Sequence, residues 1–325
     1  MAIRVAVDAL GGDRGPGEVV SGALAAATPE IVPVLYGPAD LDTRGLEHVV
    51  TDGMVEMDDK PAEAVRAKPE SSLVRAVRAV GEGAADVVVS AGNTGAMLAA
   101  GLLHVRRLAG VHRPGIGVVI PSVKGPLVLI DGGANADARP EHLVQFAHMG
   151  ALFSHDVLGV QSPTVGLLSI GEEPEKGNQL TLEAHAALTG TELRFVGNVE
   201  GRSLLEGGVD VLVCDGFTGN VALKTLEGTI KTLLGSLRDE ISASVTGKLG
   251  GLLIRPAARR LRERLDPDTY GGAYLLGLRG LLVIAHGSSS SRAIANAIRL
   301  GAAGVEHDIV STLAERLPSA SPART

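Results

Sequence analysis

The segment from Gly166 to Asn178 has the residue types of an anion-binding site. An apolar run over residues 164–170 is followed by Gly-Glu-Glu-Pro-Glu-Lys-Gly-Asn, and apolar residues from Leu180 onward indicate a helix capped by Asn178 or Thr181. Backbone N–H groups at a helix start favour phosphate, and Lys176 adds a point charge. Taken alone, the segment fits a charged surface loop better than a site.

Four other predicted strands end in residues of the same kind. They run into Asp8-Ala-Leu-Gly-Gly-Asp13, Ser90-Ala-Gly-Asn-Thr-Gly95, Asp131-Gly-Gly-Ala-Asn135 and Cys214-Asp-Gly-Phe-Thr-Gly-Asn220. Ligands of an open α/β sheet bind outside the carboxyl ends of its strands, so we expect these loops to converge. Glycine and asparagine also serve tight turns between strand and helix, but repetition at five strand ends favours a shared site.

Composition indicates an α/β protein with an aliphatic core. The chain has 325 residues, 45% of them hydrophobic, enough for one large or two modest domains. Aromatic residues make up 2% and tryptophan is absent, so Val, Leu, Ile and Ala must fill the core, which suits buried parallel strands.

Charge and cysteine content narrow the function classes. The net charge of -7 and the few aromatic residues argue against a nucleic-acid binder. A single cysteine excludes an intramolecular disulfide, and no cluster with zinc-ligand spacing occurs. No signal peptide and no apolar run of about 18 residues are recognisable, so we expect a cytoplasmic protein.

Strand and helix patterns alternate almost to the end of the chain, which predicts one α/β domain over residues 1–317 and a disordered tail over 318–325. Helices are expected after Ser71 and Ser72, which can act as caps, and from Pro140 to Leu158.

Residues 225–268 form a predicted helical hairpin. Its tip is the apolar run Leu249–Ile254, and its second arm is basic, with Pro256 in the first turn. Dimer packing is the first interpretation of this hairpin. Contact with an anionic membrane or with an acidic protein is the alternative, and neither excludes the first.

Taken in order, these motifs resemble the bacterial phosphate acyltransferases of phospholipid synthesis over nearly the whole chain. The resemblance also includes Pro140–Ala147, Tyr270–Ala273 and His286–Ser289. Arg14 and Ser290 depart from the family pattern, which commonly has His and an acid at those positions.

The resemblance implies a three-layer α/β/α sandwich with a mixed, largely parallel sheet, like that of phosphotransacetylases and isopropylmalate dehydrogenases. It implies conversion of long-chain acyl-[acyl carrier protein] and inorganic phosphate into acyl phosphate and free carrier protein. It further implies a homodimer, a functional link to a membrane glycerol-3-phosphate acyltransferase, and peripheral membrane association. The residues expected at the membrane are Leu249, Leu252, Leu253, Arg255 and Arg259.

For this reaction the sequence predicts direct attack of phosphate on a thioester, without metal or cofactor. Phosphate is already a competent nucleophile, so positioning and charge neutralisation carry the catalysis. Lys176, with Asn178 and the amide of Gly177, is expected to hold phosphate. Asn135, Asn220 or His286 is expected to stabilise the oxyanion or protonate the leaving sulfur. The other predicted site residues are Asp8, Gly92, Asn93, Thr94, Gly95, Asp131, Glu173, Asp215, Gly219 and Lys224. Among these, Asn93 and Thr94 are expected to help hold phosphate, and the three aspartates are expected to orient loops.

Three alternatives stay open. Cys214 offers an acyl-enzyme route, although it can equally be a small buried residue. A dehydrogenase of related architecture would need a Gly-x-Gly-x-x-Gly turn or an aspartate cluster, and neither is apparent. A non-enzymatic scaffold would bring acyl carrier protein to the membrane through the hairpin.

Overall fold

The computed structural model describes residues 2–265 and 269–317, so the predicted tail lies outside it. One sheet of 11 strands runs through the molecule in the order β3-β2-β1-β4-β11-β10-β5-β6-β9-β7-β8. The strands are β1 (Ile3–Asp8), β2 (Ile31–Gly37), β3 (Glu47–Val50), β4 (Val87–Ser90), β5 (Gly115–Ser122), β6 (Gly125–Ile130), β7 (Thr164–Leu168), β8 (Arg194–Val199), β9 (Val211–Val213), β10 (Ala273–Leu276) and β11 (Leu281–Ile284).

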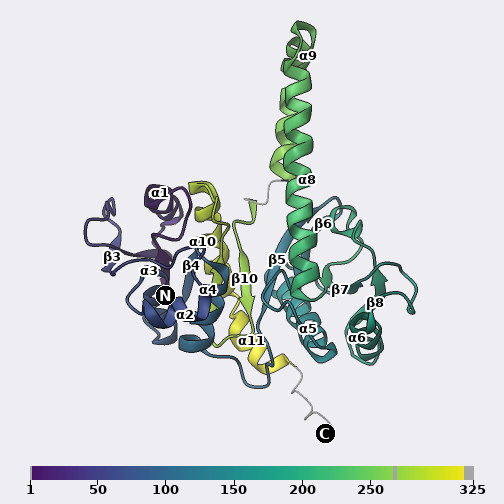
Figure 1. The fold of residues 1–325 in the computed structure, drawn as a ribbon, viewed down its shortest axis with the longest axis horizontal. Coiled ribbons are helices and arrows are strands. Elements are labelled where there is room, and N and C mark those ends of the chain that lie inside the picture. Colours follow the sequence, from purple (N-terminus) through teal and green to yellow (C-terminus); the bar gives the residue numbers. More distant parts are fainter. Residues whose placement is uncertain (1, 266–268, 318–325) are drawn as a thin grey trace.

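Helices cover both faces of this sheet (Figure 1). One face packs against α1 (Pro16–Ala26), α5 (Pro140–Asp156), α6 (Gln179–Thr189), α10 (Ser291–Glu306) and α11 (Ile309–Arg316). The other packs against α2 (Pro61–Ala67), α3 (Ser72–Gly81), α4 (Thr94–Ala100) and the π-helix η1 (Gly101–Val105) in one half, and against α7 (Ser203–Glu206) and the first turns of α8 (Gly216–Ser242) in the other.

Alternation along the strands explains the two faces. Val5 and Val7 of β1 point into one apolar cluster, whereas Ala6 points into the other. The core is made almost wholly of aliphatic side chains. The predicted fold class, a three-layer α/β/α sandwich, is therefore confirmed.

The direction of the strands changes within the sheet. Antiparallel pairs join β11 to β10, β10 to β5 and β5 to β6. After three reversals, β6, β9 and β7 run opposite to β1, β4 and β11. The five predicted loops therefore leave the sheet in two groups that face opposite edges. The expectation that they all converge at one edge is wrong, because the five strands that end in these loops do not all run in the same direction.

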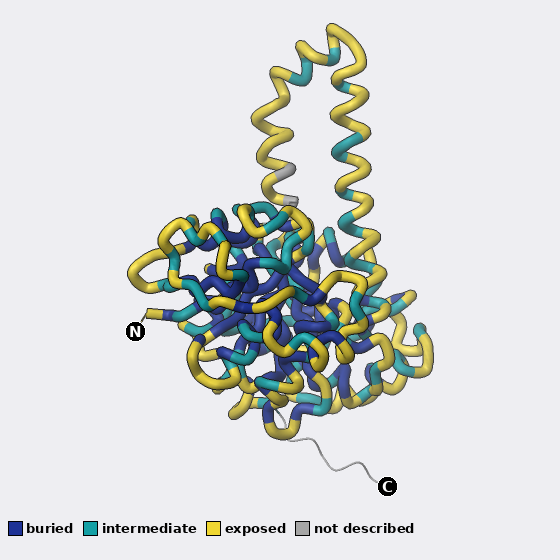
Figure 2. Tube along the Cα trace, turned by 60° about the vertical axis from the view of Figure 1, so that its left-hand side comes forward, coloured by how far each residue is buried: buried dark blue, intermediate teal, exposed yellow. Residues whose placement is uncertain are grey.

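The predicted hairpin is present, and α8 packs against α9 (Val245–Leu265) in a protrusion beyond the sheet (Figures 1 and 2). The predicted tip is wrong. The chain turns at residues 243–244, and the Ser244 hydroxyl accepts a hydrogen bond from the Gly247 amide at 2.9 Å to start α9. Pro256 consequently lies inside α9 rather than in its first turn.

None of the helices in residues 2–265 and 269–317 is long and apolar enough to cross a lipid bilayer.

Candidate active site

The loops after β1 and β4 are joined by a buried carboxylate. Ser90 donates a hydrogen bond to Asp8 at 2.6 Å, and its hydroxyl accepts from the Gly92 amide at 3.0 Å. Burial raises the pKa of Asp8. A Cβ atom on Gly11 would lie 2.6 Å from the Asp8 carboxylate, so only glycine fits there. Asp8 therefore links the two loops through Ser90.

Asn93 is used inside the fold. Its side-chain oxygen accepts from the Ala96 amide at 3.0 Å and caps α4, while its NH₂ group lies 3.1–3.3 Å from the carbonyls of Glu56, Met57 and Asp59. These contacts occupy the amide, so the interpretation of Asn93 as a phosphate ligand is not supported by its geometry. The neighbouring Thr94 is exposed, and Gly95 packs so closely on Pro61 that a Cβ would lie 2.5 Å from the proline ring.

Asp131, at the end of β6, organises the opposite edge. Its fully buried carboxylate accepts five hydrogen bonds of 2.7–3.0 Å. The donors are the amides of Ile116, Gly133, Ala134 and Asn135 and the side chain of Asn135. The Asn135 NH₂ group also donates to the Pro114 carbonyl at 2.8 Å. Both of its N–H bonds are taken, so Asn135 cannot donate to a substrate oxyanion, contrary to the sequence-based expectation.

The loop after β7 is shaped as predicted at its helix. Asn178 caps α6, since its side-chain oxygen accepts from the Thr181 amide at 2.9 Å. Gly177 has a φ of 125°, which favours glycine. Lys176 and Glu173 are exposed, and no ion pair holds the Lys176 ammonium among the residues that the structure describes. The loop backbone is fixed by Asn198, which donates to the Glu173 carbonyl at 2.8 Å.

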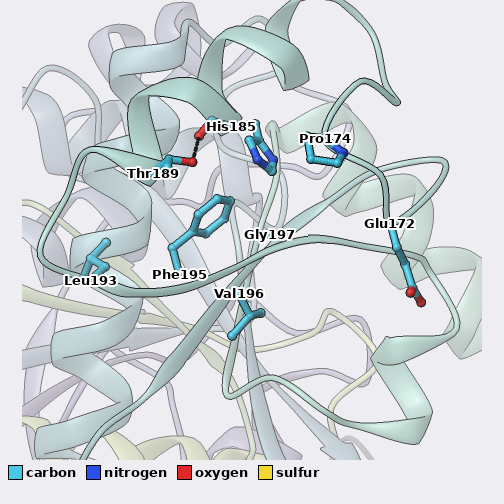
Figure 3. Close-up of a pocket in the computed structure, with 8 residues that line it drawn as sticks. All are labelled: Glu172, Pro174, His185, Thr189, Leu193, Phe195, Val196 and Gly197. Carbon is cyan, nitrogen blue, oxygen red and sulfur yellow. Dashed lines mark hydrogen bonds between the residues drawn. The ribbon is translucent and has the colours of Figure 1, made fainter.

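A shallow pocket of about 350 Å³ lies beside this loop (Figure 3). It is lined by Glu172, Pro174, His185, Thr189, Leu193, Phe195, Val196 and Gly197. Its only charged carboxylate belongs to Glu172, and none of the predicted site residues lines it. The pocket therefore does not mark the predicted phosphate site.

The start of α8 brings a second group of predicted residues together. Asp215 caps the helix by accepting from the Thr218 amide at 2.8 Å. A Cβ on Gly219 would lie 2.0 Å from the Asp131 carbonyl, so the helix packs directly on the β6 loop. Asn220 is exposed and faces Gly133, where an added Cβ atom would lie 3.5 Å from the Cβ of Asn220.

Cys214, just before α8, is buried, and its surroundings make the thiol unreactive. Burial, followed by the negative charges of Asp215 and Asp131, raises the pKa of the thiol well above its ordinary value. A thiol that stays protonated is a poor nucleophile, so the acyl-enzyme route is disfavoured.

Lys224 joins the two halves of the sheet. It lies two turns into α8, which begins at the end of β9, and its ammonium nitrogen is 3.0 Å from Nε2 of His286, which follows β11. The ammonium is also 3.0 Å from the carboxylate of Glu227, and Glu227 is 3.9 Å from His286. Nδ1 of His286 is 2.9 Å from the Ser288 hydroxyl.

Sequence reasoning missed Glu227. The signal was available, because residues three apart on a helix are neighbours and Lys224–Glu227 has that spacing. The structure thus brings Asn220, Lys224 and His286 to one helix face and its surroundings. Within residues 2–265 and 269–317, no hydrogen bond or ion pair connects this group to Lys176 or Asn178.

The departure at Ser290 has a structural role. Ser290 caps α10, and its hydroxyl accepts from the Ala293 amide at 3.3 Å. His286 is oriented by Ser288 and Lys224, so it does not need an acid at position 290.

One cluster has the residue types of a metal site. Ligand atoms of His112, Glu141 and His142 lie within 4.8 Å of one another. The Arg139 amide, however, donates to Nδ1 of His142 at 3.2 Å, which places the ring proton on Nε2 in the neutral form. Zinc would need a lone pair on Nε2, so the hydrogen bond opposes metal binding through this ring.

The chain matches the family model described as "Fatty acid synthesis protein" over residues 3–312. It is 45% identical to the phosphate acyltransferase of Moorella thermoacetica over 99% of this chain and 98% of that protein. It is 44% identical to the phosphate acyltransferase of Heliobacterium modesticaldum over 97% of this chain and 98% of that protein. A branched-chain phosphotransacylase of Enterococcus faecalis has a similar fold, with a TM-score of 0.61 and 18% identity over 94% of this chain and 99% of that one.

Proposed function

The chain belongs to the phosphate acyltransferase family and is an acyltransferase, and from this premise we propose the reaction that it catalyses. It converts long-chain acyl-[acyl carrier protein] and inorganic phosphate into acyl phosphate and free acyl carrier protein, for phospholipid synthesis. Family membership over nearly the full length supports this function above a scaffold or a dehydrogenase.

The contact of Lys224 with His286 is the observation that supports the proposed location of the reaction. This contact places a cation one helical turn after the exposed Asn220 on α8, where segments from both halves of the sheet meet. A phosphate oxygen attacks the thioester carbon there, and the carbonyl oxygen gains negative charge that N–H donors stabilise. Lys224 and Asn220 are the proposed donors, and Asn178, Lys176 and the Gly177 amide form the proposed phosphate-holding loop.

Phosphate-dependent release of carrier-protein thiol from a long-chain acyl carrier protein tests this function. Replacing Lys176 with alanine is expected to lower kcat/KM for phosphate by about 10- to 100-fold, because a charge-assisted hydrogen bond contributes about 1.5–3 kcal/mol. Lys124→Ala, which removes another exposed lysine, serves as the control and should change nothing.

Other results of the thiol-release assay would point to other functions or to another phosphate site. Release of thiol without phosphate would identify a thioesterase, and no release at all would favour the scaffold. Wild-type activity of Lys176→Ala would exclude the 171–178 loop as the phosphate site while leaving the reaction itself intact.

Cys214→Ser is expected to keep kcat within about threefold of wild type. The protonated thiol takes no part in direct attack by phosphate, and serine is close to it in size. Steady-state thiol release measures this directly. A loss of activity of about 1,000-fold with an unchanged melting temperature would instead support an acyl-enzyme.

We also propose that the protein is a cytoplasmic homodimer in peripheral contact with the membrane, and that it passes acyl phosphate to a membrane glycerol-3-phosphate acyltransferase. Exposed apolar side chains near the tip of the hairpin support the membrane contact: Leu253 is 83% exposed and Leu249 63%. The exposed Arg255 and Arg259 lie within about three turns of them on the same helix, as binding to anionic lipid would require.

The double variant Leu252→Asp/Leu253→Asp is expected to lose most of its binding to vesicles rich in anionic lipid, because two charges would enter the apolar layer. Its thiol release in solution should stay at the wild-type level. Co-sedimentation with vesicles measures the binding, and Leu182→Asp/Val196→Asp, outside the hairpin, is the matched control. Binding equal to that of wild type would remove the Leu249–Ile254 segment from the proposed contact.

A further inference from the structure

We propose that Lys224 supplies the donor that contacts the substrate, and that Glu227 and His286 are positioning residues that hold its ammonium group. This inference rests on the proposed function and assigns roles within the same site. It changes the role expected for His286 from the sequence, which was to stabilise the oxyanion or to protonate the leaving sulfur.

Lys224 has one N–H bond left for a substrate oxygen. An ammonium group has three N–H bonds and no acceptor. One N–H points to the Glu227 carboxylate and a second to Nε2 of His286, each with a heavy-atom distance of 3.0 Å. The third N–H has no partner among the residues that the structure describes. With two bonds fixed, the direction of the third is fixed as well, and it is available to an oxygen of phosphate or of the thioester carbonyl.

The contact with Lys224 determines which ring nitrogen of His286 carries the proton. Because an ammonium group can only donate, Nε2 of His286 must accept, and the ring proton of the neutral form then lies on Nδ1. That proton has an acceptor, since the Ser288 hydroxyl is 2.9 Å from Nδ1. The Ser288 amide also points its N–H at Nδ1 from 3.2 Å, and a neutral ring cannot accept hydrogen bonds at both nitrogens. The bond from the ammonium group is shorter and charge-assisted, so it decides the tautomer over the weaker contact of the neutral amide. In this arrangement His286 has no N–H left for the leaving sulfur.

Glu227 limits the positions that the Lys224 side chain can adopt. It lies one turn after Lys224 on the same helix, and its side chain is only 28% exposed. Lysine has a flexible stem with four rotatable bonds, so an unpaired Lys224 would sample many positions. Glu227 and His286 hold the group from two elements, and this reduces the freedom lost when substrate binds.

The reaction balances without an acid from the protein. A bond forms between a phosphate oxygen and the carbonyl carbon, the C–S bond breaks, and one of the two protons of dihydrogen phosphate passes to the leaving sulfur. Lys224 neutralises the charge that develops on the carbonyl oxygen and undergoes no net change in protonation.

Replacement of His286 by glutamine separates a positioning role from an acid role. The glutamine oxygen can accept from Lys224 near the place of Nε2, but its amide cannot act as a proton donor at neutral pH. We expect His286→Gln to keep at least a third of wild-type kcat, His286→Ala to fall at least 10-fold, and the pH profile of His286→Gln to keep both limbs. Equal losses in the two variants, with the acidic or basic limb missing, would overturn the proposal.

Glu227 is tested in the same assay. Glu227→Ala is expected to lower kcat about 10-fold with little change in KM for the acyl carrier protein, and Glu227→Gln, which retains an acceptor, should recover part of the loss. Glu63→Gln breaks a Lys–Glu pair with the same helical spacing, that of Lys60 with Glu63, and should be silent. Wild-type kcat in Glu227→Ala would refute the role of Glu227.

The tautomer of His286 can be measured by NMR spectroscopy, without an assay of enzyme activity. In protein labelled with ¹⁵N at histidine, the two ring nitrogens of His286 should show the Nδ1–H tautomer in the free protein, identified by loss of the signal in His286→Gln. The Nε2–H tautomer would contradict the inference even if the enzyme is active. Absence of phosphate-dependent turnover in the wild type would contradict the proposed function and leave the tautomer result standing.

Discussion

Lys224→Ala is expected to lower kcat/KM for phosphate-dependent thiol release by about 100- to 1,000-fold. Removal of one donor that stabilises a developing oxyanion has an effect of this size in acyl transfer. The variant also leaves the Glu227 carboxylate without its cation, so a negative charge would face the incoming phosphate. Steady-state kinetics with varied phosphate and a fixed long-chain acyl carrier protein measure the effect.

Two further variants make this result specific. Lys231→Ala removes an exposed lysine from the same helix two turns later and should retain wild-type kinetics. Lys224→Arg keeps the charge but not the compact geometry of the ammonium, so we expect it to recover less than a tenth of the activity. Activity of Lys224→Ala within threefold of wild type would exclude the helix α8 site.

Asp131→Ala is expected to lower the free energy of unfolding by about 3–5 kcal/mol. The substitution removes the acceptor of five hydrogen bonds and leaves buried N–H groups without partners, each of which costs about 1–3 kcal/mol before the loop relaxes. Urea unfolding followed by circular dichroism measures the change.

The matched control for this variant is Asp239→Ala, an exposed aspartate on α8. It should change the free energy of unfolding by no more than about 0.5 kcal/mol. Asp131→Ala with the stability of wild type would mean that water replaces the carboxylate, and that the loop after β6 does not depend on it.

Local patterns in the sequence predicted the fold class well. The apolar strands before Asp131 and Cys214 and the cap at Asn178 are formed as expected, because each depends on a few consecutive residues. The apolar run before the 171–178 loop predicts a strand that is too long: β7 ends at Leu168, and Ile170 is 81% exposed.

The direction of the strands could not be predicted in this way. It depends on the pairing of β10 with β5, whose residues are more than 150 positions apart in the chain. Apolar runs do not reveal such partners, since a buried strand has the same composition in either direction.

The candidate site was predicted in part for a related reason. Asn220, Lys224 and His286 were all named, and the structure brings them together, but their roles depend on partners that only the folded chain defines. Asn93 was expected to hold phosphate and Asn135 to donate to the oxyanion, yet their N–H bonds are taken by backbone carbonyls and by Asp131. The sequence cannot distinguish a free amide from one that is already bonded.

The tip of the hairpin was predicted at the apolar run Leu249–Ile254, and this position is wrong. Gly250 and Gly251 of that run lie within α9, where they cost helix stability without ending it. Ser244 marks the actual start of the second arm through its hydroxyl.

Helix α8 acts as a lever that is clamped at one end. Its first turn is fixed against the β6 loop by the close approach of Gly219, and its 27 residues extend about 40 Å at about 1.5 Å per residue. Lys224 lies about 12 Å from the clamped end, so a sideways swing of the free end is reduced to about a third at the ammonium group. The protruding end can therefore be displaced by an ångström or two while the 3.0 Å contact between Lys224 and His286 persists.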